Sequence, residues 1–171
     1  LTNVNTYSGT TTVKGGALLV NSPGALTASP VTVTNGGTLG GDGTFNAPVV
    51  ALNGGLLSPG RDVYVIGTMN LAASGTALNL NGARLLMHLL TNAAPTCDLI
   101  ALTGPSGTLQ LDGTNTLTLL SPFGLVPAGT YTLMTYAART GSGTLVLDRT
   151  YTNATLNVGA TSVTLTVTGA A

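Results

Sequence analysis

The chain has one histidine, His88, and one cysteine, Cys97, so a nucleophilic catalytic site would have few groups to draw on. A Ser–His–Asp or Cys–His site would have to use this imidazole, because the base that activates such nucleophiles is normally a histidine. His88 stands in the apolar run LMHL at 86–89, nine residues before Cys97. This context favours a packed or surface histidine over a catalytic one. Zinc is not predicted either, since it needs three or four nitrogen, sulfur or carboxylate ligands.

All acidic residues are aspartates: Asp42, Asp62, Asp98, Asp112 and Asp148. Two carboxylates can hydrolyse a glycosidic bond, and Asp42 and Asp62 are separated by the length of one repeat described below. They could stack on neighbouring repeats near Arg61. The flanking glycines in GDG at 41–43 favour a turn instead. The neighbouring opposite charges 61–62 and 148–149 are predicted to be solvated loop pairs. We therefore expect no catalytic residues and no enzymatic activity.

The sequence contains no complete motif for a metal ion or a cofactor. Calcium suits aspartate and the backbone carbonyls of glycine turns, but GGDG at 40–43 has no second copy. The glycine pairs are not followed by the Lys-Ser/Thr of a phosphate-binding loop. We therefore expect no metal and no cofactor. The one N-glycosylation sequon is Asn153-Ala154-Thr155.

The composition excludes several classes of protein. Only 6% of the 171 residues are charged, against about 25% in an ordinary domain. Five basic residues balance five acidic ones, so no basic patch is available for nucleic acid. The longest apolar patch, 85–90, is too short to span a membrane. Threonine, glycine and asparagine are abundant and glutamate is absent, which predicts an all-β protein. The start at Leu1, without a leader pattern, suggests a mature or excised segment.

A recurring phrase in the first half predicts the architecture. It reads VKGGALLV at 13–20, VTNGGTL at 33–39 and ALNGGLL at 51–57, with a weaker copy ASGTAL at 73–78. The second glycine of each copy falls at 16, 37, 55 and 75. A short strand, a glycine turn and another short strand, recurring at such a nearly constant spacing, are typical of a β-solenoid. The alternative is a series of antiparallel hairpins with Asn-Gly turns.

The second half has a different pattern. Alternating strands are expected at 98–103, 108–111, 115–120, 129–136, 143–147, 154–158 and 162–168. They predict a sheet with one apolar face that is antiparallel at least in part. Residues 83–90 fit either a helical turn or a buried strand. We expect solenoid repeats over residues 1–80 and a β-rich region over residues 81–171, packed continuously on the first.

The opening residues resemble the autotransporter-associated β-strand repeat. The matching segments are NTYSG at 5–9, TTV at 11–13 and LLVN at 18–21, followed by GGTLGG at 36–41 and LSPG at 57–60. The resemblance covers most of the chain in order and is strongest over residues 1–60. It implies a secreted bacterial surface protein with a passenger-like β-solenoid. The family carries no set of catalytic residues that could be transferred to this chain.

Three functions follow from these observations, in decreasing order of support. The first is a non-catalytic extracellular structural module that self-assembles end to end into a fibre, because few charges protect its strand edges. The second is an adhesin or glycan-binding module that uses tyrosines and binds cell-surface glycans. The third is a polysaccharide-active enzyme that uses Asp42 and Asp62. The candidate tyrosines for the second are Tyr7, Tyr64, Tyr131, Tyr136 and Tyr151.

Overall fold

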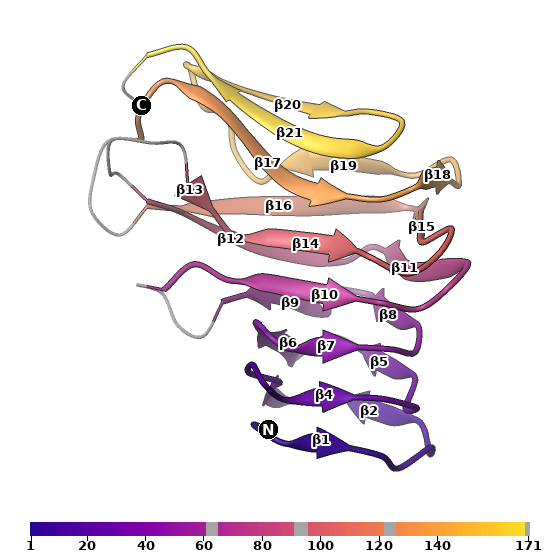
Figure 1. Ribbon diagram of the computed structural model, residues 1–171. Helices are drawn as coiled ribbons and strands as arrows, with labels where there is room; N and C mark the ends of the chain where they lie inside the picture. Colours follow the sequence, from indigo (N-terminus) through magenta and orange to yellow (C-terminus); the bar gives the residue numbers. More distant parts are fainter. Residues whose placement is uncertain (61–64, 91–95, 122–125, 170–171) are drawn as a thin grey trace.

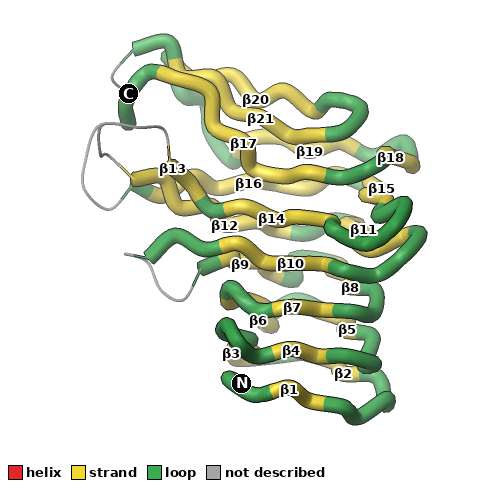
Figure 2. Tube along the Cα trace, in the orientation of Figure 1, coloured by secondary structure: helices red, strands yellow, loops and turns green. Residues whose placement is uncertain are grey.

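A computed structural model describes residues 1–60, 65–90, 96–121 and 126–169. Every regular element in these four ranges is a β-strand, and Figure 2 shows strands and loops with no helix between them. The prediction of an all-β protein is therefore confirmed. Figure 1 shows the chain winding upward from its N-terminus in successive layers, each lying directly on the one before.

Three sheets form the sides of this winding. The first sheet contains, in spatial order, β1 (Val4–Asn5), β4 (Ala25–Leu26), β7 (Thr44–Phe45), β10 (Thr68–Leu71), β14 (Leu99–Leu102), β17 (Gly129–Thr135), β21 (Ser162–Val167) and β20 (Ala154–Val158). The second contains β18 (Ala138–Thr140), β15 (Thr108–Asp112), β11 (Thr76–Asn81), β8 (Val49–Leu52), β5 (Val31–Val33) and β2 (Thr11–Val13). The third contains β19 (Thr144–Leu147), β16 (Thr114–Leu120), β12 (Arg84–Leu90), β9 (Leu56–Pro59), β6 (Gly37–Gly41) and β3 (Gly16–Leu19).

One strand from each sheet makes one rung of the solenoid, and successive rungs pair in parallel. In the third sheet Leu18 pairs with Leu39, and Leu39 pairs with Leu57. Leu57 in turn pairs with Leu85. Because side chains alternate along a strand, this register stacks one apolar column on the inner face. The core is thus a set of vertical columns, which agrees with the solenoid predicted for residues 1–80.

Glycine is required at the corner between the second and third sheets. Gly36 has a φ of 88°, a conformation that other residues rarely adopt. A Cβ added to Gly37 would lie 2.2 Å from the carbonyl oxygen of Val13 on the rung below. Gly55 is in the same situation, 2.5 Å from the oxygen of Val33. Gly37 and Gly55 therefore let neighbouring rungs approach closely at this corner.

The fourth copy of the phrase is not equivalent to the other three. Gly75 lies between β10 and β11, at the corner between the first and second sheets. The corner that matches Gly37 and Gly55 is reached only at Gly82, between β11 and β12. The prediction that Gly75 continues the series is therefore wrong. The rung between these two corners has lengthened: the paired residues Leu57 and Leu85 are separated by a longer stretch of chain than the preceding pair, Leu39 and Leu57.

Parallel pairing continues beyond residue 80. The alternative of antiparallel hairpins in the first half is wrong, because all pairs from β1 to β9 are parallel. Residues 84–90 form a strand rather than a helical turn. Antiparallel pairing occurs where β13 (Thr96–Cys97) meets β12, and where β21 pairs with β17 and β20. The division into regions 1–80 and 81–171 stays a prediction.

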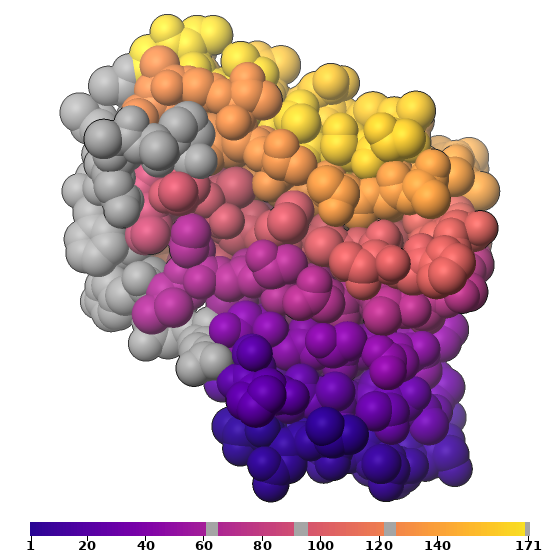
Figure 3. Space-filling model, viewed as in Figure 1, coloured from indigo at the N-terminus to yellow at the C-terminus, as the bar shows by residue number. Residues whose placement is uncertain are grey.

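The two ends of the solenoid differ. At the upper end of Figure 1 the hairpin of β20 and β21 continues the first sheet past β17. At the lower end β1, β2 and β3 are the outermost strands of the three sheets. Figure 3 shows that the first rungs form a narrower column than the later ones. Among the described residues there is no helix long and apolar enough to cross a membrane.

Candidate functional site

The histidine singled out from the sequence lies on β12 with its side chain almost completely buried. Met87 and Leu89 on either side point into the solenoid core and are buried. By the alternation of a strand, His88 points to the opposite face, yet only 2% of its surface is exposed. The imidazole lies at the corner where the chain passes from the third sheet back to the first. There it is close to Asp98, the residue just before β14.

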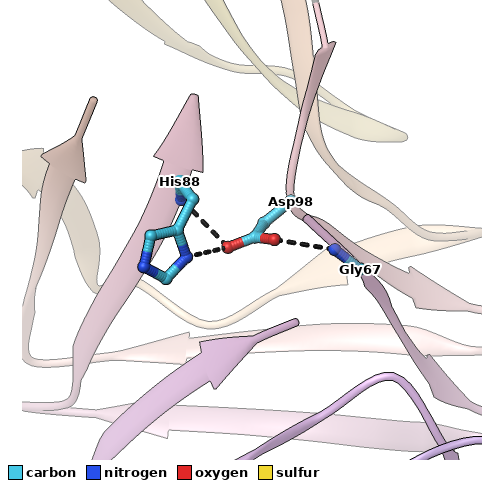
Figure 4. A network of polar contacts seen from close by, with 3 residues as sticks. All are labelled: Gly67, His88 and Asp98. Carbon is cyan, nitrogen blue, oxygen red and sulfur yellow. Dashed lines mark hydrogen bonds and ion pairs between the residues drawn. The ribbon is translucent and has the colours of Figure 1, made fainter. Parts of the chain in front are cut away.

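Asp98 connects three segments of the chain through its two carboxylate oxygens. Oδ2 lies 2.5 Å from His88 Nδ1 and accepts the His88 backbone N–H at 2.9 Å. Oδ1 accepts the backbone N–H of Gly67 at 2.9 Å. The Asp98 N–H in turn donates to the His88 carbonyl oxygen at 2.9 Å. Figure 4 shows the carboxylate between β12 and the strand that begins at Thr68. Asp98 itself is fully buried.

An aspartate on Nδ1 of a histidine is also the arrangement that orients a catalytic base. In such a site the nucleophile would lie at Nε2. Here Nε2 is buried and has no hydrogen-bond partner. The described residues therefore bring no nucleophile to His88. What the geometry does provide is a buried, charge-assisted connection between two successive rungs.

Cys97 does not complete a Cys–His pair. Its thiol donates to the carbonyl oxygen of Thr132 at 3.3 Å, on the neighbouring strand β17. Burial, and secondarily the Asp98 carboxylate, raises the pKa of the Cys97 thiol to about 12. Since the thiolate is the reactive form, this cysteine is a poor nucleophile and a poor metal ligand at neutral pH.

The carboxylate pair considered for glycoside hydrolysis lies partly outside the described residues. Arg61 and Asp62 belong to that part of the chain, so their stacking with Asp42 stays untested. Asp42 accepts the backbone N–H of Ser22 at 2.8 Å, which fits the turn role expected for it. In the ranges that the structure describes, no three histidine, cysteine or acidic side chains come together to hold a metal.

A buried amide that the sequence reading missed joins the rungs at the glycine corner. Asn115 Oδ1 accepts the Ala83 N–H at 2.8 Å, and its Nδ2 donates to the carbonyls of Asp112 and Thr144. The three partners belong to three successive rungs. The available signal was a polar residue two positions after Gly113, on the inner face of an alternating strand.

A second polar cluster lines a groove between β19 and β20. The Asp148 carboxylate accepts the Tyr151 hydroxyl at 3.2 Å and the Thr118 hydroxyl at 3.1 Å. Arg149 Nε lies 3.6 Å from the same carboxylate, and its guanidinium is 5.6 Å from the centre of the Tyr151 ring. The Arg149 side chain is 64% exposed, which confirms the predicted solvated pair of Asp148 and Arg149.

The other candidate tyrosines have structural positions. Tyr131 and Tyr136 are buried and donate to the carbonyl oxygens of Pro127 and Gly159. Tyr7 lies on the first rung, where its hydroxyl contacts that of Thr11 at 2.7 Å. Tyr64 lies outside the described residues. The structure thus places Tyr151 alone, among the described tyrosines, in a groove with charged side chains.

No protein-family model matches the chain. A curated relative, the Adhesin BmaC autotransporter of Brucella suis biovar 1 (strain 1330), is 42% identical to it over 60 residues. The aligned part is 35% of this chain and 2% of the relative. The chain therefore spans a very small part of the length of the protein that it matches.

Proposed function

We propose that the chain is a non-catalytic structural segment of the passenger of a bacterial surface adhesin. The observation that carries this proposal is the stack of parallel rungs, in which the strands of each inner rung pair with the rung above and the rung below. Each added rung extends such a stack by about 4.8 Å, the spacing between paired strands. A longer series of rungs would hold a binding region away from the cell. The similarity to an autotransporter adhesin supports the same setting.

The composition also suits an extracellular stack. Polar, uncharged threonine and asparagine side chains can form columns on the outer face without repulsion between like charges. For example, Thr12 pairs with Thr32, and Gln110 pairs with Asn79 below it and Thr140 above it. The stack depends on this register and on an apolar interior rather than on disulfides, since the chain has a single cysteine.

Surface display tests this proposal directly. The chain is placed between a secretion signal and a translocator domain in a Gram-negative host, and its exposure is measured by protease shaving of intact cells. We expect the chain to be displayed and to acquire protease resistance. The matched control replaces Leu57 in the core by Asp, which should leave export intact but abolish the resistance. Retention of the parent chain inside cells that display a known passenger would contradict the proposal.

End-to-end assembly into a fibre stays a prediction of the sequence. It requires the open strands of one copy to pair with the opposite end of another. At the end opposite β1, the outermost strand of the first sheet is β20 rather than β17. This sheet would therefore have to pair through the hairpin of β20 and β21. Negative-stain electron microscopy tests the prediction, and monodisperse monomers at high concentration would contradict it.

Glycan binding is the second candidate, and the groove at Tyr151 favours it. A tyrosine ring beside a carboxylate and a guanidinium offers a stacking face together with hydrogen-bonding groups. Burial and the Asp148 carboxylate raise the pKa of Tyr151, so its hydroxyl stays protonated and donates to Asp148. A glycan array followed by titration of Tyr151→Ala tests this. We expect any binding to be lost in this variant and kept in Tyr7→Ala; no binding by the parent chain would exclude it.

A further inference from the structure

An apolar cavity lies inside the upper end of the solenoid, between the last strands of the third sheet and the hairpin of β20 and β21. Its volume is about 190 Å³. Its most buried walls are formed by Leu89 of β12, by Leu165 and Val167 of β21, and by Val126. These four side chains carry no hydrogen-bonding group, so this part of the cavity favours an apolar occupant over water.

The cavity exists because the third sheet becomes shorter at its last rung. β19 pairs with β16 only as far as Leu117, whereas β16 continues to Leu120. After β19 the chain leaves the sheet, where the Asp148 N–H donates to the Leu117 carbonyl oxygen at 2.9 Å. In the described part of the third sheet, Leu119 therefore has no strand above it, and its side chain is only partly buried.

A small residue on the hairpin leaves the remaining space open. Ala154, Leu156 and Val158 lie on one face of β20 by alternation, and all three pack against the core. Ala154 pairs with Val167, so these two residues lie side by side on the wall of the cavity. Because alanine ends at its Cβ, it does not fill the volume that a longer side chain at this position would occupy.

Polar groups lie on the side where the cavity reaches the surface. Ser121 and Tyr151 line the cavity there and are only partly buried. Tyr151 and Ala154 also line the groove between β19 and β20, so the cavity and the groove meet at these two residues. The groove holds opposite charges close together, since Arg149 Nε lies 3.6 Å from the Asp148 carboxylate. A ligand that spans both spaces would therefore have an apolar end and an uncharged polar end.

We propose that this cavity binds a single aromatic ring whose uncharged polar substituent extends past Tyr151 into the groove. The volume fits one ring, because an apolar protein cavity of about 150 Å³ stays dry and takes up benzene. The ring of Tyr151 at the mouth offers a partner for an edge-to-face contact, which aromatic pairs prefer. The Tyr151 hydroxyl donates to the Asp148 carboxylate at 3.2 Å, and this bond holds the ring in place. The ligand class is thus a small aromatic alcohol.

This inference goes beyond the two functions proposed above. Ring binding depends on the space beside Ala154, whereas glycan binding would depend on Tyr151 and the charged residues of the groove. Neither surface display nor a glycan is needed to observe it. The three ideas can therefore fail separately.

Titration with benzyl alcohol tests the proposed site. Saturation-transfer NMR shows which protons of the alcohol contact the protein, and the chemical shifts of leucine and valine methyl groups locate the contact. We expect saturable binding, stronger transfer to the ring protons than to the CH₂ protons, and the largest methyl shifts at Leu119, Val126 and Leu165.

Two variants of one cavity residue show whether the space itself is required. Ala154→Leu fills the cavity, and the dissociation constant for benzyl alcohol should rise at least tenfold. If this variant does not fold, Ala154→Val carries the same comparison, with an expected rise of at least threefold. The matched control is Ala138→Leu at an exposed alanine on β18, which should bind like the parent chain.

Four results would overturn this proposal. The first is the absence of saturable binding of benzyl alcohol by the folded parent chain. The second is an unchanged dissociation constant in folded Ala154→Leu or Ala154→Val. The third is a set of methyl shifts located away from the cavity. The fourth is tighter binding of hexan-1-ol than of benzyl alcohol, because the site would then select a flexible alkyl chain rather than an aromatic ring.

Discussion

His88 Nδ1 lies 2.5 Å from Asp98 Oδ2, and this buried contact joins strand β12 to the beginning of β14 on the next rung. Asp98 Oδ2 also accepts the backbone N–H of His88 at 2.9 Å. The same carboxylate holds the Gly67 N–H at the start of β10. One side chain therefore connects the two successive corners at which the chain passes from the third sheet to the first, before β10 and before β14.

Replacement of Asp98 by Ala is expected to destabilise the fold strongly. The change leaves the imidazole, the His88 N–H and the Gly67 N–H without their acceptor in a buried site. Leaving a buried hydrogen-bonding group without its partner costs about 1–3 kcal/mol for each group. Urea denaturation followed by circular dichroism measures the loss. Asp112→Ala, at a half-buried position, is the control and should cost about 1 kcal/mol or less; equal losses for both variants would refute a special role of Asp98.

A methyl group at Gly37 should be tolerated far less well than one at Gly15. At Gly37 the added Cβ meets the Val13 carbonyl oxygen at 2.2 Å, whereas at Gly15 nothing lies within 4 Å. Overpacking of this kind costs about 1–3 kcal/mol, while Gly15→Ala should be neutral or stabilising by about 0.5 kcal/mol. Thermal unfolding of the two variants checks the difference. Similar melting temperatures would mean that the rungs are not in close contact at this corner.

Shortening a leucine in the column of the third sheet should destabilise the fold less at the first rung than in the middle of the column. Leu57 is fully buried between two rungs, and Leu57→Ala should lose about 3 kcal/mol through transfer and cavity terms. Leu18 is partly exposed on the first rung, so Leu18→Ala should lose about half as much. The same denaturation experiment measures both. A larger loss at Leu18 would show that the first rung is covered in solution.

Cys97 should react slowly with thiol reagents in the folded protein. Because burial raises its pKa to about 12, the thiol stays protonated at pH 8 and reacts through a very small thiolate fraction. Alkylation followed by mass spectrometry measures the rate at several pH values. We expect the rate still to rise between pH 9 and pH 11, and unfolding in urea to restore ordinary reactivity. Rapid alkylation of the folded chain at pH 7 would contradict the burial of this thiol.

Much of the fold could be read from local pattern. The glycines at 16, 37 and 55 recur at a nearly constant spacing because each occupies the same corner of its rung, so their period indicates the solenoid. The strands expected after residue 98 also form, since alternation of apolar and polar residues is a local property. The solvated pair of Asp148 and Arg149 follows from the adjacency of two opposite charges in the sequence.

The sequence by itself thus determined the strands, the turn residues and the repeating unit, because short-range steric and hydrophobic preferences specify them. The tertiary structure decided which strands meet. Rungs lengthen after residue 60, so Gly75 moves to a different corner and a fixed period no longer identifies partners. His88 and Asp98 are close in the sequence, yet their contact exists only because the chain between them returns to the same corner. Pairing partners and buried polar contacts depend on the path of the whole chain, and no local pattern contains that path.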